Sequence, residues 1–344
     1  MAYTTIPKST AHFNTKLWNG NSSTQAITGI GFAPDIVWGK NRTGTQSHQL
    51  LDIIRGANNI LTPNSNATAL ADSQILNSFD ADGYTLGSQD QLNDTGYTYV
   101  GWNWKANGAG ASNTDGSITS TVSANTTSGF SIVKFVGNGL AGATIGHGLG
   151  AVPKMTIIKS TTAGEDWIIP PLNDPTNYIV LNSSATAGNG IGPFNNTAAT
   201  SSVFTVGTWG TTNGNSQTLM AYCFAEKQGF SKISSYIGNG NVDGPFVYTG
   251  FKPAFVMAKK TSGTGRWSIL NNKSNPFNVA YLMLSPNENS ADYTAAAWNT
   301  DFLSNGFKIR SSESEYNANG STYIYMAFAS EPLVSTNGNA ATAR

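Results

Sequence analysis

The sequence is poor in charge and in long apolar runs. Only 11% of its 344 residues are charged and the formal net charge is zero, which argues against a surface that grips nucleic acid or an anionic membrane. No apolar run is long enough for a transmembrane helix, and no leader of basic and apolar residues follows Met1. We therefore expect a soluble protein with no membrane insertion and no nucleic-acid partner.

Cysteine and histidine are also scarce. The single cysteine, Cys223, excludes an intrachain disulfide and a thiolate metal cluster. It lies in the apolar run TLMAYCFAEK, which predicts a buried, inert thiol in a protein that folds in a reducing cell. His12, His48 and His147 stand in no HExxH or zinc-ligand spacing. The sequence thus predicts no catalytic residue, no metal site and no cofactor.

Two pairs of acidic residues are the remaining candidates for chemistry. Glu165 and Asp166 stand beside Trp167, and a glycosidase needs two facing carboxylates. Asp80 and Asp82, in FDADGYTL, are compatible with the start of a calcium loop. The later ligand positions of such a loop are missing, which favours a tight Asp-Gly turn.

What the chain does have is one pattern written three times. A glycine-rich turn and then a proline open each copy, in LWNGN…GIGFAPDIVWGK, FVGNG…GAVPKMTIIK and YIGNG…GFKPAFVMAKK. An aromatic residue and then the last aromatic residue of a closing strand follow the proline at spacings that hardly change from copy to copy. The landmarks are Pro34, Tyr84 and Trp104; Pro153, Phe204 and Phe224; and Pro253, Phe307 and Phe328.

Two further positions recur in the copies. A tryptophan follows the proline at one identical spacing in the later two, and we assign Leu50 or Leu51 to that place in the first. A lysine closes the strand that the proline begins, and we expect it to mark where each strand reaches solvent. The residues concerned are Trp167 and Trp267, and Lys40, Lys159 and Lys259.

The repeats set the domain organisation. We expect an N-terminal arm, a first module, a polar linker that is flexible or draped over a surface, two further modules that abut, and an extended tail. Their bounds are 1–10, 11–106, 107–128, 129–228, 229–332 and 333–344.

Within each repeat the signals are those of strands. In TYVGWNW, Val100, Trp102 and Trp104 alternate with small or polar residues, which predicts a central core strand. Each proline belongs at the first position of a second strand, because it cannot donate to a ladder. Only LLDIIRGANNIL indicates a helix, and a short one. These features predict an all-β protein of three tandem antiparallel β-sandwich modules, jelly-roll or lectin-like, each of about 100 residues.

Candidate ligand contacts lie outside the strand landmarks. Most tryptophans fall on strands and are expected in the core. Trp209, in GTWGTTNGNSQ, and Trp298, in AAAWNTDF, are the better surface candidates, with Asn213 and Asn215 beside the first. Tryptophan and asparagine together suit a glycan, whose rings stack and whose hydroxyls form hydrogen bonds.

The segments GFSIVKFVGNG…GHGLGAVPKMTIIK, AYCFAEKQGFSKISSYIGNGNVDGPFVYTGFKPAFVMAKK and DFLSNGFKIRSSESEYNANGSTYIYMAFA resemble the repeat modules of virion structural and tail-fibre proteins of tailed bacteriophages, especially marine phages and cyanophages. The opening MAYTTIPKSTAHFNTKLWNGN is similar to the start of such proteins, so the resemblance covers nearly the whole chain. It implies a virion-surface protein that acts in adsorption or decoration, and it implies no catalytic residues.

These observations together predict a non-enzymatic phage surface protein, a tail fibre or receptor-binding appendage, assembled in the host cytoplasm. A head-decorating fibre or knob is the alternative, and a glycan-degrading tail enzyme is the alternative of a different class. The expected partners are other virion proteins, a host glycan or receptor, and further copies of the chain, with a trimer favoured. We expect the arm to dock on the particle, through Tyr3, Ile6 and Pro7.

Overall fold

A computed structural model describes residues 3–332 and residue 334. The predicted C-terminal tail therefore lies almost wholly outside the described residues. Strands make up 42% of the chain and helices 6%, so the predicted all-β class is confirmed. Among the described residues no helix is long and apolar enough to cross a membrane.

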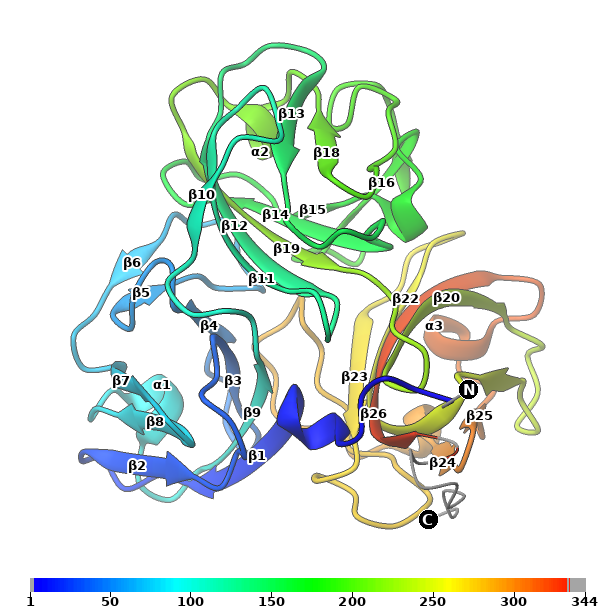
Figure 1. The fold of residues 1–344 in the computed structure, drawn as a ribbon. Coiled ribbons are helices and arrows are strands. Elements are labelled where there is room, and N and C mark those ends of the chain that lie inside the picture. Colours follow the sequence, from blue (N-terminus) through cyan, green and yellow to red (C-terminus); the bar gives the residue numbers. More distant parts are fainter. Residues whose placement is uncertain (1–2, 333, 335–344) are drawn as a thin grey trace.

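The first repeat forms a four-stranded sheet and a three-stranded sheet (Figure 1). The larger has the order β1 (Phe13–Asn19), β9 (Thr98–Trp104), β3 (Ile36–Asn41) and β4 (Gln49–Asp52). The smaller has the order β2 (Gln25–Thr28), β8 (Gly83–Leu86) and β7 (Leu76–Asp80). The repeat also contains η1 (Ser9–Ala11), α1 (Asp90–Asn93) and the pair β5 (Asn59–Ile60) and β6 (Leu70–Ala71).

The second repeat carries the largest sheet. Its eight strands have the order β10 (Ala111–Asn113), β11 (Ser120–Asn125), β12 (Phe130–Val136), β19 (Thr218–Phe224), β14 (Met155–Ser160), β15 (Ile168–Ile169), β16 (Asn177–Val180) and β17 (Gly188–Asn189). The smaller sheet pairs β13 (Ala143–Gly146) with β18 (Val203–Val206). Two single turns of helix complete it, η2 (Pro171–Asn173) and α2 (Gly210–Asn213).

The third repeat resembles the first. Its larger sheet has the order β20 (Ser231–Ile237), β26 (Thr322–Pro332), β22 (Phe251–Lys260) and β23 (Trp267–Asn271). The smaller has the order β21 (Phe246–Tyr248), β25 (Gly306–Ile309) and β24 (Thr300–Leu303). The helical turns are η3 (Ala296–Trp298) and α3 (Ser314–Asn317).

The closing strand is central in each larger sheet, as its alternation predicts. β9 lies between β1 and β3, β19 between β12 and β14, and β26 between β20 and β22. In β9, Trp102 and Trp104 enter a core shared by all three repeats, while Tyr99 enters a core private to the first. Successive side chains of a strand point to opposite faces, so this strand is buried on both sides.

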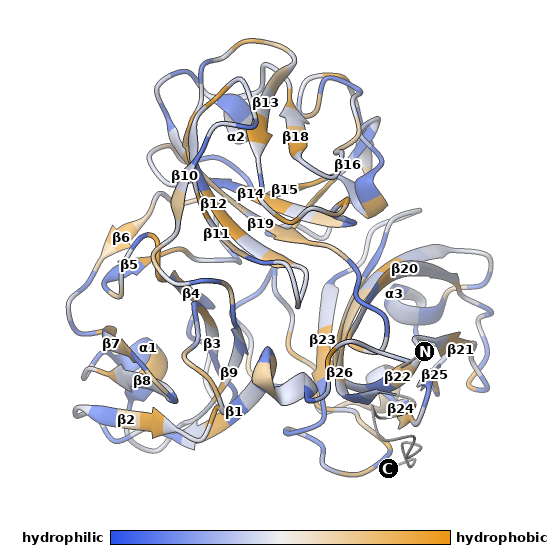
Figure 2. Cartoon of the chain, in the orientation of Figure 1, coloured by the Kyte–Doolittle hydropathy of each residue, from blue (hydrophilic) through white to orange (hydrophobic). Residues whose placement is uncertain are grey.

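The three larger sheets meet face to face around the centre of the molecule, so the repeats are not strung out like beads (Figure 1). The last landmark aromatics, Trp104, Phe224 and Phe328, contact one another, with ring centroids 6.1, 5.6 and 6.0 Å apart. Figure 2 shows hydrophobic residues on the strands that face this centre and hydrophilic residues on much of the outer loops. The last landmark aromatic of each repeat is thus the residue through which the repeats contact one another.

Equivalent hydrogen bonds cross two of the boundaries between repeats. The indole N–H of Trp167, in repeat two, donates to the carbonyl oxygens of Thr62 (3.1 Å) and Ser65 (3.0 Å) in repeat one. The indole of Trp267, in repeat three, donates to the carbonyl of Val180 in repeat two at 2.9 Å. A residue at the same place in repeat one would complete a ring.

His48 is that residue, and the assignment of Leu50 or Leu51 was wrong. His48 follows Pro34 at the spacing that separates Trp167 and Trp267 from their own prolines. Its Nε2 is 2.9 Å from the carbonyl oxygen of Ser285 in repeat three. The indole of Trp38 donates to its Nδ1, which leaves Nε2 to carry the proton and donate. Burial holds the pKa of His48 well below its usual value, so the ring stays neutral.

The predicted linker 107–128 is neither flexible nor merely draped over a surface. Its residues form β10 and β11, and β11 pairs along its whole length with β12. Ile118 and Val122 enter the private core of repeat two. Polar strands at a sheet edge need few apolar anchors, because the ladder satisfies their backbone groups.

The expected helix in LLDIIRGANNIL is also absent. The segment contains β4, a turn and β5. Arg55 fixes the turn, because its guanidinium binds the Asp52 carboxylate at 2.6 Å and donates to the carbonyl oxygens of Leu50 and Asn59. Tertiary contacts have outweighed a weak local preference for helix.

The three strand-ending lysines do not reach solvent. Lys40, Lys159 and Lys259 are all buried. The ammonium of Lys159 donates to the carbonyl of Asn66 in repeat one, and that of Lys259 to the carbonyls of Ser184 and Ala185 in repeat two. Each of these two lysines therefore clasps a loop of the preceding repeat, which covers a strand end that would be exposed in an isolated module. Burial lowers the pKa of all three to about 8.

Candidate functional site

A buried asparagine closes the outer tip of each repeat. It is the last residue of α1, α2 or α3, and it stands at the same spacing before the landmark aromatic in every copy. In repeat two, Asn213 accepts the backbone N–H of Asn138 and donates to the carbonyls of Leu140 and Gly207 at 2.9 Å each. The three equivalents are Asn93, Asn213 and Asn317.

This asparagine clamp corrects one predicted ligand contact. Asn213 is fully buried and its amide is used within the chain, so it cannot contact a ligand. Asn215, two positions on, is exposed as a contact would require, and it lies against Gly139 of the facing turn. The clamp asparagine therefore positions the residues that precede and follow the short helix of each repeat.

The residue that precedes each short helix differs between repeats. Gln89 and Glu313 fold back, and each accepts the backbone N–H of the second residue after it. Trp209 occupies the same position in repeat two and cannot cap its helix. A missing cap costs about 1 kcal/mol, and a broken local rule within a repeated scaffold is expected at functional sites.

Trp209 and Tyr178 form an aromatic platform on repeat two. Their rings meet edge to face, 5.1 Å apart at an interplanar angle of 71°. Each ring lies over a glycine: a side chain at Gly192 would collide with the Trp209 indole, and one at Gly188 with the Tyr178 ring. Trp209 remains 37% exposed. Tyr178 is partly buried against the core of repeat two, and the Trp209 indole, supported from beneath and open to solvent, suits stacking on a planar or pyranose ligand.

A carboxylate lies near the platform. The side chain of Glu165 sits against Gly210, the first residue of α2, where any larger residue would collide with it. Its neighbour Asp166 is used structurally, since it accepts a 2.7 Å hydrogen bond from the Asn182 amide. The platform thus has an aromatic surface with a carboxylate acceptor, Glu165, beside it.

The structure places the other tryptophan candidate in a core. Trp298 is buried in the private core of repeat three, packed on the Tyr316 ring at 5.7 Å. The prediction that it contacts ligand is wrong, because η3 turns its side chain inward to fill the space beneath the sheet.

The proposed docking arm is largely used within the chain. Ile6 is buried in the shared core, and the Tyr3 hydroxyl donates to the carbonyl of Gly250 in repeat three. Pro7 is exposed. Figure 1 shows the N-terminal segment lying along repeat three, so the arm connects the first repeat to the last.

The second acidic pair, Asp80 and Asp82, has structural partners. Asp82 accepts the backbone N–H groups of Gly29 and Gly31, and Asp80 accepts the hydroxyls of Ser78 and Thr85. No group of three or more potential metal ligands occurs in the part of the chain that the structure describes.

His147 and Cys223 are also engaged within the fold. His147 is buried, with its Nδ1 accepting the backbone N–H of Leu149. Cys223 is buried as predicted, and burial raises the pKa of its thiol to about 12.

Two further positions that recur in the sequence indicate structural residues whose roles the sequence analysis did not identify. The clamp asparagine keeps its spacing to the landmark aromatic, and His48 keeps the spacing of Trp167 and Trp267. A comparison of shared aromatic residues and glycines does not detect either position, because the clamp residue is a polar asparagine and the other position changes from histidine to tryptophan. Trp209 stands out once the clamp has fixed its equivalents in the other repeats.

Comparison with known proteins gives a family and no function. Neither the curated proteins nor the solved structures contained a match to this chain. One family model, described as a domain of unknown function (DUF7483), matches residues 8–332. That match takes in all three repeats and the closing hydrogen bonds between them, and the chain belongs to the DUF7483 family.

Proposed function

We propose that this protein is a non-enzymatic surface component of a bacteriophage particle, a tail fibre or receptor-binding appendage that contacts the host during adsorption. We infer that each repeat is a β-sandwich module, since in each a larger and a smaller sheet enclose a private apolar core. The resemblance of the repeats to phage structural modules supports the assignment of the chain to a phage particle. The geometry supports the binding role.

The observation that carries the proposal is the contrast between constant scaffold and variable tip. The same clamp asparagine holds the same helical turn three times, yet it is preceded by Gln89, Trp209 or Glu313. Two of these side chains serve their own helix, and the third is presented to solvent. A rigid scaffold that displays different side chains at equivalent loops is typical of binding proteins.

The closed ring also bears on assembly. Three repeats of one chain already surround a common centre, so a threefold arrangement exists within a single copy. A binding site of threefold symmetry on the particle would then bind a single chain. Self-association remains part of the proposal and is measured by ultracentrifugation of the purified chain.

The test is adsorption of the purified chain to host cells. Labelled wild-type protein should bind the cells and compete with the phage for them, and an antibody against it should decorate purified particles. Trp209→Ala should abolish both binding and competition. Gln89→Ala, at the matched position of repeat one, should leave both intact. Particles that lack the protein, or a Trp209→Ala chain that competes as well as wild type, would contradict the proposal.

A further inference from the structure

A groove of about 380 Å³ runs along the boundary between repeats two and three. Its size is within the range of small-ligand sites. One wall comes from the segment around η2 and from β16, and the other from β20, the start of β26 and the turn after β22. It lies apart from the aromatic platform: Asn177 lines the groove, while Tyr178, the next residue of β16, belongs to the platform.

The lining of the groove combines apolar surface with polar side chains. Leu172 and Ala187 provide apolar surface, and Ser235, Thr322 and Asn177 provide neutral polar groups. The side-chain hydroxyls of Ser235 and Thr322 make no hydrogen bond within the described part of the chain, so they are available to a ligand. A pyranose ring has the matching form, with C–H groups on its faces and hydroxyls around its edge.

A carboxylate in the groove is held in place. Asp174 accepts hydrogen bonds from the backbone N–H and hydroxyl of Thr176 and from the amide of Asn177. The backbone N–H of Asn177 also acts on this carboxylate, so hydrogen bonds from two residues fix its orientation. Partial burial acts to raise the pKa of Asp174, but the hydrogen bonds together outweigh it and hold that pKa below its usual value. The group is therefore ionised and oriented, and it forms part of the groove lining.

The apolar wall rests on a strained turn. Leu172 has φ 54° and Asn173 has φ 63°, in the left-handed region that non-glycine residues rarely adopt. Such strain persists only where the surroundings enforce it, and it gathers at ligand sites. Asn173 anchors the turn, because its amide exchanges hydrogen bonds of 3.1 and 2.9 Å with the backbone of Ala199.

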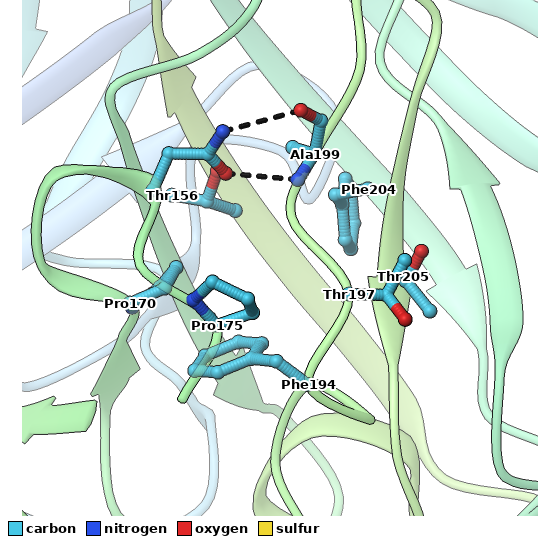
Figure 3. A pocket seen from close by; sticks show the side chains of 9 residues that line it. Thr156, Pro170, Pro175, Phe194, Thr197, Ala199, Phe204 and Thr205 are labelled. Carbon is cyan, nitrogen blue, oxygen red and sulfur yellow. Dashed lines mark hydrogen bonds between the residues drawn. The ribbon is translucent and has the colours of Figure 1, made fainter. Parts of the chain in front are cut away.

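Figure 3 shows the two hydrogen bonds of this anchor as dashed lines to Ala199. The dashed bonds to Ala199 lie beside Pro170, Pro175 and Phe194 around a small cavity. That cavity has room for about one water molecule, so it supports the turn and is no ligand site itself.

The boundary between repeats one and two has an equivalent groove of about 260 Å³. Lys134 stands there at the position of Ser235, since each lies opposite the fourth residue before the landmark aromatic of its closing strand. Thr161 and Thr218 repeat Thr261 and Thr322. Lys134 and Arg55 thus line the groove between repeats one and two. The described residues that line the groove between repeats two and three include no basic group.

From these contacts we infer that the groove between repeats two and three binds one pyranose unit of a neutral glycan. The ring lies on Leu172 and Ala187, and its hydroxyls bond Ser235, Thr322 and the Asp174 carboxylate. The absence of a basic group from this lining disfavours a phosphate or an acidic sugar. The inference deepens the proposed function by naming a class of receptor sugar at a second, separate site.

The experiment is saturation-transfer NMR and titration of the full chain with methyl glycosides of glucose, galactose, mannose and N-acetylglucosamine. At least one should bind wild type. Ser235→Lys, which copies the other groove at an exposed position, should weaken that binding by about tenfold or more. The matched control is the reverse change, Lys134→Ser, which should leave it unchanged. Thermal unfolding of each variant checks that the fold is kept.

The outcomes separate the two proposals. Binding that survives Ser235→Lys, or no binding of any glycoside to wild type, overturns the groove as a neutral-sugar site. Loss of glycoside binding in Trp209→Ala alone would place the sugar on the platform instead. Glycoside binding in the groove by a chain that never competes for host cells would leave the groove intact and contradict the role in adsorption.

Discussion

Closure of the ring between repeats three and one should draw on a buried ion pair, in addition to the His48–Ser285 hydrogen bond and the N-terminal arm. The chain runs directly from repeat to repeat at the other two boundaries, whereas this boundary joins the first repeat to the last. Arg42 and Asp292 meet there at 2.6 Å, with side chains only 14% and 10% exposed, and the Asp292 backbone N–H donates to the Arg42 carbonyl at 2.7 Å. Backbone bonds of the same kind cross the other boundaries, to Thr161 and Thr261, and no buried ion pair between described residues of different repeats accompanies them.

The magnitude follows from the burial of the pair. Removing one partner of a buried ion pair leaves the other uncompensated and costs about 3–5 kcal/mol; because this pair keeps slight exposure, we expect Asp292→Ala to cost about 3 kcal/mol. The pair itself adds little net stability, since burial raises the pKa of Asp292 more than Arg42 lowers it. The double variant Arg42→Met/Asp292→Leu should therefore lie within about 1 kcal/mol of wild type.

The assay is urea unfolding followed by tryptophan fluorescence, analysed as a double-mutant cycle. Asp301→Ala is the control, because its partner Arg310 lies at the same 2.6 Å but is 42% exposed. That change should cost less than about 1 kcal/mol. If Asp292→Ala costs no more than the control, the ion pair does not close the ring and the reasoning fails.

Three further predictions concern the repeated positions. Burial lowers the pKa of Lys159 and Lys259 to about 8 from 10.5. Above pH 8 the unfolded chain therefore binds more protons than the folded chain, and the free energy of unfolding should rise with pH between about 8 and 9.5. Lys159→Met should reduce the slope of that rise. Asn213→Ala removes the partner of two carbonyls and of the Asn138 N–H, and it should lower the free energy of unfolding in urea by about 1–3 kcal/mol. Asn215→Ala on the surface should cost less than about 0.5 kcal/mol; equal costs would contradict the clamp. Trp104→Ala, at the centre of the shared core, should cost about 3–5 kcal/mol and unfold all three repeats in one calorimetric transition, whereas a separate transition for repeat one would show that the core does not couple them.

The sequence by itself determined the strands and their repetition. Alternation in TYVGWNW predicted a central core strand, and constant spacing predicted three copies, because side-chain period and chain length are local quantities. It also pointed to Trp209 and Asn215 as exposed residues. It failed at Trp298 and Asn213, where the same residue types turn inward, since a loop sequence does not say which way a side chain faces.

Only the tertiary structure decided what the repeats do to one another. Lys159 looks like a strand end that reaches water until the Asn66 loop of repeat one covers it, and His48 looks like a lone histidine until Ser285 lies 2.9 Å away. The groove that holds Ser235 does not exist in either repeat alone. Contacts between residues from opposite ends of the chain leave no local trace in composition or spacing. The sequence therefore specified the repeat, and packing around Trp104, Phe224 and Phe328 turned three repeats into one closed molecule.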